Sequence, residues 1–511
     1  MSSGTRNEPK EVKPVQEISS SNDRIIDEKS TQKEEEKTSS NTPNTSNTAN
    51  TPDTPKNDPT EAPASTASPG MTWNDWKKLP LQFFMVYMVI FCMYLGFLSI
   101  YWGSLYHRED RVKNMKILIA IEDSPYQLSN STDVDPSIGP RFKQLVDAHP
   151  NLGHFVFANT TELSQKAAEK NTTWLSVLEE DVHQNKYWAA IHVNSDTSAN
   201  AYNLLLSGNT SSPSALGLGQ SITALYETGR HYSALSMYVT KSINALSDSW
   251  ISTYAPSAYA SMVKTHLTPQ QQQNLVSSAN SSSTGASFSF LPSFKLVDMR
   301  PAKSTVVLGP SEIGLVYAQI FSFHQFNFSA DLHSSVRETL RFRHYLFYRV
   351  MFSQLNHIIL ALVYGLMTIA FRVPTDVAYG KAGFLVLWAV LYLFMSASGG
   401  LNECVCTIIM FYKKTYLLPP WIIGMVVVNI APTFAPYVLT PGFYRYGYTM
   451  PMFHAYEALK VVFFDTWKGT LGLNYGILVA WVVVTNIVLC FLLKYISKKT
   501  KENQLNELSK L

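Results

Sequence analysis

The chain has 511 residues, a formal net charge of +3 and a mean hydropathy of -0.03. This average combines a polar start, a polar middle and very apolar runs, so the parts have to be read separately. All four cysteines lie in or beside the apolar runs, which excludes a disulfide framework in the polar middle. They are Cys92, Cys404, Cys406 and Cys490.

The chain begins with a polar segment, residues 1–78. Its first 70 residues contain no Phe, Trp, Tyr, Leu or Cys and are rich in Ser, Thr, Asn, Pro, Glu and Lys. Such a composition cannot bury enough apolar area to offset the entropy of ordering, so we expect a disordered cytosolic tail.

Six apolar runs follow, one within residues 79–106 and five within residues 305–495. Each has at least the roughly 20 residues that a helix needs to cross a bilayer. The first run follows a long polar tail and lacks a small-residue cleavage site, so it predicts an anchor and not a signal peptide. The sequence therefore predicts an α-helical polytopic membrane protein with six transmembrane helices. The runs are residues 81–103, 305–327, 348–371, 383–412, 418–439 and 473–494.

Positive side chains near the runs predict the orientation, because Lys and Arg flanks remain in the cytosol. The clusters all fall on one side if both termini are cytosolic, including the basic C-terminus, residues 496–511. Residues 107–304 then lie on the exoplasmic side. The clusters are Lys77 and Lys78; Arg337, Arg341, Arg343 and Arg349; Lys413 and Lys414; and Lys494, Lys498, Lys499 and Lys501.

Glycosylation acceptor motifs within residues 107–304 agree with this orientation. Each is an Asn followed by any non-Pro residue and then Ser or Thr, a pattern that marks surface loops in the secretory pathway. We therefore expect a glycoprotein. The acceptors are Asn130, Asn159, Asn171, Asn209 and Asn280.

The exoplasmic residues predict a large inserted α/β domain. Short apolar segments at Asn114–Ile121 and Trp188–Val193 are typical of buried strands. Helical patterns cover Thr160–Asn185 and Ser221–Tyr254. The domain is long enough to form its own core without disulfides.

No motif in the chain predicts catalysis, a cofactor or a metal site. There is no Gly-x-Ser-x-Gly elbow, no His-Glu-x-x-His helix and no Gly-x-x-x-x-Gly-Lys-Ser/Thr loop. Cys404 and Cys406 lack a second ligand pair, so small apolar residues are the simpler interpretation. We expect no enzyme, no cofactor and no nucleic-acid partner.

Two carboxylates lie within the apolar runs, and an ionised carboxylate in hydrocarbon is costly. Glu312 lies near the start of the second run, where an interfacial position is the alternative to a functional one. Glu403 lies deeper, after a stretch of small residues at 396–400. That stretch predicts a helix-packing surface, and Glu403 is a candidate proton or substrate contact.

The segment 440–472 is aromatic although it lies outside the runs. Its first part carries Tyr444, Tyr446 and Tyr448, and aromatic rings of this kind are favoured at headgroup depth. From Met452 onward, apolar residues recur at helical spacing, which predicts a short helix in the outer membrane interface. The three tyrosines are candidate lipid or substrate contacts, with an ordinary aromatic belt as the alternative.

Several strings of residues resemble the fungal nitrosoguanidine-resistance membrane proteins. They are Pro432–Pro436, Leu439–Pro451, Leu473–Gly476 with Trp481, Lys186–Asn194, Ile313–Tyr317 and Tyr379–Phe384. That family is similar in layout to ABC-2-type membrane domains and to bacterial phage-infection proteins, with one span, a large exoplasmic domain and five spans. Glu312 departs from its pattern, which has an uncharged polar residue there.

The resemblance implies a plasma-membrane protein that contributes to drug resistance, by export or by changing the distribution of membrane lipids. Membrane lipids and a hydrophobic drug-like substrate are then the expected partners, with a homo-oligomer or a separate ATPase or regulatory protein as further partners. The alternative function is a lipid-sensing scaffold or regulator without transport. The alternative location is the endoplasmic reticulum.

Overall fold

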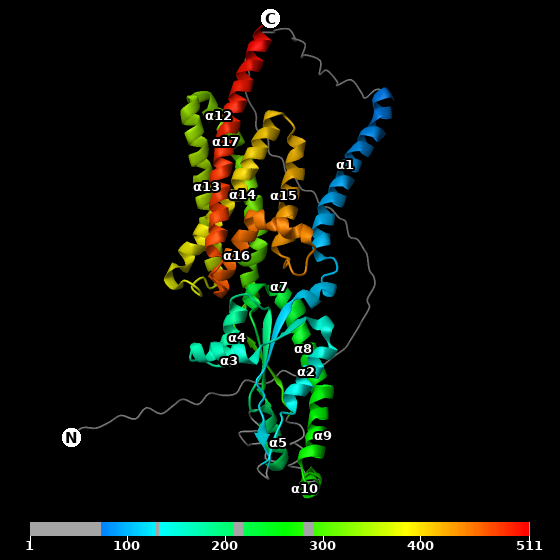
Figure 1. Cartoon of the computed structure of the whole chain (residues 1–511). Coiled ribbons are helices and arrows are strands. Elements are labelled where there is room, and N and C mark those ends of the chain that lie inside the picture. The colour runs from blue at the N-terminus through cyan, green and yellow to red at the C-terminus, as the bar shows by residue number, and fades with distance from the viewer. Residues whose placement is uncertain (1–72, 129–131, 208–217, 280–290, 510–511) are drawn as a thin grey trace, which may run out of the picture. The chain divides into compact units, whose positions relative to one another are not determined.

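The computed structural model describes residues 73–128, 132–207, 218–279 and 291–509 (Figure 1). These residues belong to one compact unit, Trp73–Leu511. The tail predicted to be disordered lies outside the described residues up to Thr72. The candidate glycosylation sites Asn130, Asn209 and Asn280 also lie outside them.

Six helical segments among the described residues are long and apolar enough to cross a membrane, and they match the six predicted runs. They are Phe83–Leu105, Thr305–Phe328, Phe342–Ala370, Gly380–Phe411, Thr415–Thr433 and Leu471–Leu508. Their principal helices are α1 (Trp73–Leu105), α11 (Gly314–Phe328), α13 (Phe342–Ala370), α14 (Gly383–Phe411), α15 (Leu418–Thr433) and α17 (Leu471–Leu508). The protein is therefore mostly helical, with the layout of a membrane protein.

Two of these helices differ in length from the predicted runs. Helix α15 ends at Thr433 and not near residue 439, because Pro432 and Pro436 interrupt backbone hydrogen bonding. Helix α17 continues to Leu508, so residues 496–508 of the segment predicted as a separate basic C-terminus, 496–511, continue the last helix.

Residues 109–300 contain a five-stranded sheet in the order β4-β1-β5-β6-β7, and we call this part the sheet region. The strands are β1 (Lys116–Ile121), β4 (His154–Phe157), β5 (Ala189–Val193), β6 (Ile222–Tyr226) and β7 (Phe294–Asp298). Strand β1 pairs in parallel with β4 and β5, while β6 is antiparallel to β5 and parallel to β7. The short strands β2 (Tyr126–Gln127) and β3 (Asp133–Val134) form a separate antiparallel pair.

Helices cover both faces of this sheet (Figure 1). Successive side chains point to opposite faces, so Ile117 and Ile119 join one core while Leu118 and Ala120 join the other. The first core includes α2 (Ile138–Ala148), α5 (Thr197–Ser207), α8 (Thr240–Ser249), α9 (Ala255–His266) and α10 (Pro269–Ala279). The second includes α3 (Thr160–Glu169) and α4 (Trp174–His183).

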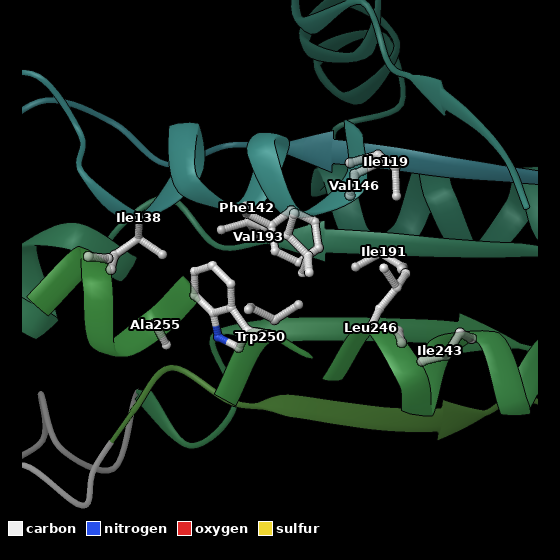
Figure 2. Packing of buried hydrophobic residues seen from close by; sticks show 14 of the residues in the cluster. Ile119, Ile138, Phe142, Val146, Ile191, Val193, Ile243, Leu246, Trp250 and Ala255 are labelled. Atoms are coloured by element: carbon white, nitrogen blue, oxygen red, sulfur yellow. The ribbon is translucent and has the colours of Figure 1, made fainter. Parts of the chain in front are cut away.

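Trp250 lies at the centre of the first core. Figure 2 shows it facing Phe142 of α2, with 5.6 Å between the ring centroids. Its indole nitrogen donates a hydrogen bond of 2.5 Å to the carbonyl of Pro292, which satisfies the one polar atom of the ring. This core therefore connects the helices to the segment before β7.

The prediction of a helix over Ser221–Tyr254 is wrong at its start. Residues Ile222–Tyr226 form β6, and helix begins only at α7 (Tyr232–Ala234) and continues in α8. Four of the five β6 residues are buried between the two helical layers. An apolar run this short cannot be assigned from periodicity alone, and pairing with β5 and β7 decides its structure.

Segment 440–472 contains a 3-10 helix, η11 (Gly442–Thr449), and the helix α16 (Pro451–Phe464). We expected the second helix to lie in the membrane interface, but almost all of α16 is buried among α14, α15 and α17. Its polar side chains have internal partners: His454 hydrogen-bonds with Asn474, and Lys460 with Glu457. The remaining helix, α12 (Ala330–Thr339), joins α11 to α13.

Candidate functional site

A buried ion pair joins α13 to α14. Arg349 Nε lies 3.1 Å from Glu403 Oε1, and Arg349 Nη2 donates to the same oxygen. The two side chains are 4% and 2% exposed. Tyr345 lies 3.1 Å from Arg349 Nη1, and the ring of Phe326 from α11 lies 5.4 Å from the guanidinium carbon. Three helices therefore enclose the pair.

The positions on α13 explain how the sequence builds this site. Tyr345, Arg349, Ser353 and His357 follow one another at intervals of four residues, which places them along one face of the helix. All four are buried. A polar stripe thus faces the interior of the helical region and not the lipid.

Small residues on α14 allow the neighbouring helices to approach closely. A Cβ atom on Gly399 would overlap the ring of His357, and one on Gly400 would overlap Thr485 of α17. Small residues have this role in many membrane helices. The stretch before Glu403 is therefore a packing surface, as its composition predicts, and it positions the carboxylate opposite Arg349.

Several polar atoms in this interior have no hydrogen-bond partner among the described residues. They include Glu403 Oε2, His357 Nε2, Ser398 Oγ and both amide atoms of Gln319 on α11. Buried polar atoms are normally paired, and hydrocarbon offers them no water. The Arg349–Glu403 pair and these atoms form what we call the polar core, which can accept a proton or bind a polar group.

Glu312 belongs to a different cluster. It lies in the short π-helix η8 (Gly309–Ile313), and its Oε1 accepts a hydrogen bond of 3.2 Å from Tyr456 of α16. Lys460, one turn further along α16, donates 2.8 Å to the carbonyl of Arg230 in the sheet region. The structure therefore places Glu312 beside the junction of the two regions and not in the polar core.

Two of the three candidate tyrosines of η11 hydrogen-bond to the membrane helices α1 and α15. Tyr444 donates to the Ile100 carbonyl of α1 at 2.7 Å, and Tyr446 donates to the Val428 carbonyl of α15 at 3.0 Å. Tyr448 is 51% exposed, and its ring lies 4.3 Å from that of Tyr437. Two of the hydroxyl groups therefore have internal partners, and Tyr448 presents the most exposed ring of the three.

The junction between the regions contains cations that the sequence did not single out. Arg230 stacks on Trp188, with its guanidinium carbon 3.9 Å from the ring centroid, and donates to the carbonyl of Tyr187. Burial lowers the pKa of Arg230 to about 10. Burial, together with nearby Lys460 and Arg108, also holds the pKa of His231 well below its usual value.

Sequence reasoning missed most of the polar core. Its position in the sequence assigns Arg349 to the cytosolic cluster between the second and third runs, whereas the structure buries it inside α13. His357 and Gln319 were not singled out. The available signal was the four-residue spacing from Tyr345 to His357, which marks one helix face.

Comparison with known proteins gives the family but no activity. A relative from Saccharomyces cerevisiae, an uncharacterized endoplasmic reticulum membrane protein, is 27% identical over 437 residues, which cover 84% of this chain and 82% of the relative. No solved structure matches the chain. The resemblance to nitrosoguanidine-resistance proteins stays a prediction. The family model described as a protein of unknown function, DUF3533, matches residues 86–487, and the chain therefore belongs to the DUF3533 family.

Proposed function

We propose that this membrane protein translocates an amphipathic compound and thereby contributes to resistance against toxic compounds, by exporting them or by changing the distribution of membrane lipids. The observation that supports this function is the Arg349–Glu403 pair inside the helical region. Ionisable residues within membrane helices are rare and mark ion, proton or substrate pathways. A purely structural bundle gains little from a buried ion pair, because desolvation offsets most of the attraction.

The polar core suggests how translocation is linked to protons. Glu403 uses Oε1 for Arg349, while Oε2 has no partner among the described residues. A proton on Oε2 removes the charge that holds Arg349 and weakens the link between α13 and α14. The two helices then separate more easily, since a ligand or proton shifts a conformational equilibrium when it favours one state. The 511 residues hold no phosphate-binding loop, so an ATP-driven cycle needs a separate ATPase.

A transport assay in liposomes tests the proposal. We would measure movement of a fluorescent phospholipid and of a labelled hydrophobic drug, with and without a proton gradient. The test variant is Arg349→Gln with Glu403→Gln, which removes both charges and avoids leaving one unpaired. The matched control is Glu162→Gln with Lys166→Gln, an exposed pair on α3.

The proposal expects gradient-dependent transport in the wild type and in the control, and its loss in the double variant. Transport by the double variant at the wild-type rate would show that the pair is not part of a pathway. Absence of transport in every protein, including the wild type, would remove translocation as the function.

Location in the plasma membrane, with both termini in the cytosol, is part of the proposal. The named location of the yeast relative favours the endoplasmic reticulum instead. A fluorescent tag at the C-terminus, imaged beside markers of both membranes, distinguishes them.

The second candidate function is a lipid-sensing scaffold, and the contacts of α16 favour it. This helix contacts the sheet region through Lys460, and Asp465 at its end accepts hydrogen bonds from Arg300. A change in the membrane helices can therefore reach the sheet region through α16. A scaffold that signals through its tail needs residues 1–70, whereas a transporter keeps its activity when they are deleted.

A further inference from the structure

A cavity of about 250 Å³ lies where the sheet region meets the helices. Its walls come from three segments: the link from β7 to α11, the residues after α13 and the end of α16. The cavity is at the ends of two candidate spans, Thr305–Phe328 and Phe342–Ala370. It is therefore at the depth where a lipid headgroup would lie.

Three cations and one carboxylate line this cavity: Arg300, Lys303, Arg372 and Asp465. Asp465 already accepts hydrogen bonds from Arg300, and Lys468 lies 2.8 Å from its Oδ1. Lys303 and Arg372 are exposed, and neither side chain has a hydrogen bond or ion pair with any described residue. The cavity thus has an excess of positive charge that the described residues leave uncompensated.

An apolar groove of about 790 Å³ continues from the cavity between α11 and α13. The two hollows share Val306, Phe371 and Val373 as lining residues. The groove has no Asp, Glu, Lys, Arg or His in its lining. Its volume lies within the roughly 300–1,000 Å³ that is usual for sites of small molecules.

Specific packing forms one end of the groove. Tyr364 of α13 donates a hydrogen bond of 3.0 Å to the carbonyl of Pro310 in η8. A Cβ atom on Gly314 would overlap the Tyr364 hydroxyl, so this contact depends on glycine. By contrast, a Cβ atom on Gly309 would meet nothing within 4 Å, which leaves space along the wall of the groove.

We infer that the cavity and the groove together bind one phospholipid with an acidic headgroup. The headgroup and phosphate contact Lys303 and Arg372, and the acyl chains occupy the apolar groove. Basic pockets beside membrane helices recognise anionic headgroups in this way, and a guanidinium matches phosphate geometry. A free phosphate would leave the groove unused, and a neutral lipid would leave two cations uncompensated. The inference goes beyond the proposed translocation, because binding here requires no movement of the lipid.

Lipid retention by the purified full chain tests the inference. The protein would be equilibrated with phosphatidylserine or phosphatidylcholine in detergent and washed, and the retained lipid would be counted by native mass spectrometry. The headgroup variant is Lys303→Gln with Arg372→Gln. The groove variant is Gly309→Leu, which fills free space without a clash at Cβ. The matched control is Arg343→Gln with Lys414→Gln, exposed cations in the first turn of α13 and in the link before α15.

The wild type and the control should retain one phosphatidylserine per chain in preference to phosphatidylcholine. Loss of two charged hydrogen-bond donors should weaken retention about tenfold or more, and the groove variant should lower retention of both lipids. Thermal stability of each variant, measured in parallel, separates loss of binding from loss of fold.

Three outcomes would overturn the inference. The wild type could retain both lipids equally, the control could lose phosphatidylserine as strongly as the headgroup variant, or both test variants could retain it like the wild type. Complete displacement of phosphatidylserine by millimolar inorganic phosphate would be a fourth such outcome, because it would show that contacts with the anion alone hold the lipid and that the groove contributes nothing.

Discussion

The Arg349–Glu403 pair gives a prediction whose magnitude follows from its geometry. Glu403→Gln removes one charge and leaves the buried Arg349 without its counter-charge. At 3.1 Å and an effective dielectric constant near 20, the lost attraction is about 5 kcal/mol. Removing one partner of a buried pair typically costs about 3–5 kcal/mol. We therefore expect Glu403→Gln to lower the free energy of unfolding by about 3–5 kcal/mol.

The double variant tests whether the loss of stability arises from the interaction between Arg349 and Glu403. Arg349→Gln with Glu403→Gln leaves two neutral amides that can hydrogen-bond to each other, so it should be more stable than either single variant. Unfolding in detergent, followed by tryptophan fluorescence, measures all four proteins of this double-mutant cycle. The exposed pair Glu162 and Lys166 is the control and should show almost no coupling.

Additive losses would refute this reasoning. If the double variant loses as much stability as the two single variants combined, the two charges do not stabilise each other. If Glu403→Gln alone is as stable as the wild type, Arg349 has another counter-charge and the pair is not the centre of the polar core.

Two further predictions follow from named contacts, and a third follows from the acceptor motifs. Gly399→Ala should lower the thermal stability of the protein, because the added Cβ would overlap His357. Adding His357→Ala should restore part of that stability. If thermal unfolding shows no recovery in the double variant, the packing argument is wrong. Tyr444→Phe should lower the free energy of unfolding by about 0.5–1.5 kcal/mol, since it removes a hydrogen bond to α1, and an unchanged denaturation midpoint would contradict it. Glycosidase treatment should increase the gel mobility of the protein. Replacing all five acceptor asparagines, including the exposed Asn159 and Asn171, should abolish this mobility shift. A shift that persists in the variant would place glycans elsewhere.

The membrane-spanning part of the fold could be predicted well because hydropathy depends on composition alone. A run of about 20 apolar residues has few alternatives to a membrane helix. Two strands were also predicted correctly in type, β1 and β5, because their residues are buried on both faces and so form continuous apolar strings. For these helices and strands, the local sequence pattern predicts the same structure that the whole fold contains.

The sequence was less informative where tertiary contacts decide the structure. The strand β6 resembles the start of a helix until β5 and β7 pair with it. Helix α16 has the spacing of an amphipathic helix, but its polar positions find partners inside the protein, as Lys460 does with the carbonyl of Arg230. Neither outcome can be read from a single segment, since each depends on residues more than 20 positions away.

Of the two charged residues in the candidate site, the sequence alone could identify one and not the other. Glu403 could be singled out because a carboxylate within an apolar run is unusual. Arg349 could not, because an arginine near the end of a run normally belongs to the positive flank. Only the packing of α13 against α14 shows that the charge turns inward.

The length of α17 has a mechanical consequence. Its 38 residues span about 57 Å, whereas the hydrocarbon core of a bilayer is about 30 Å thick. The helix therefore extends beyond the membrane as a continuous rod. One residue inserted near Lys498 would rotate everything after it by about 100° and leave the membrane-embedded part unchanged. A protein that docks on this rod would respond to the angle of the helix, so an insertion of one residue should weaken its binding. An insertion of seven residues returns the docking face to within about 20° of its original angle and should weaken binding less.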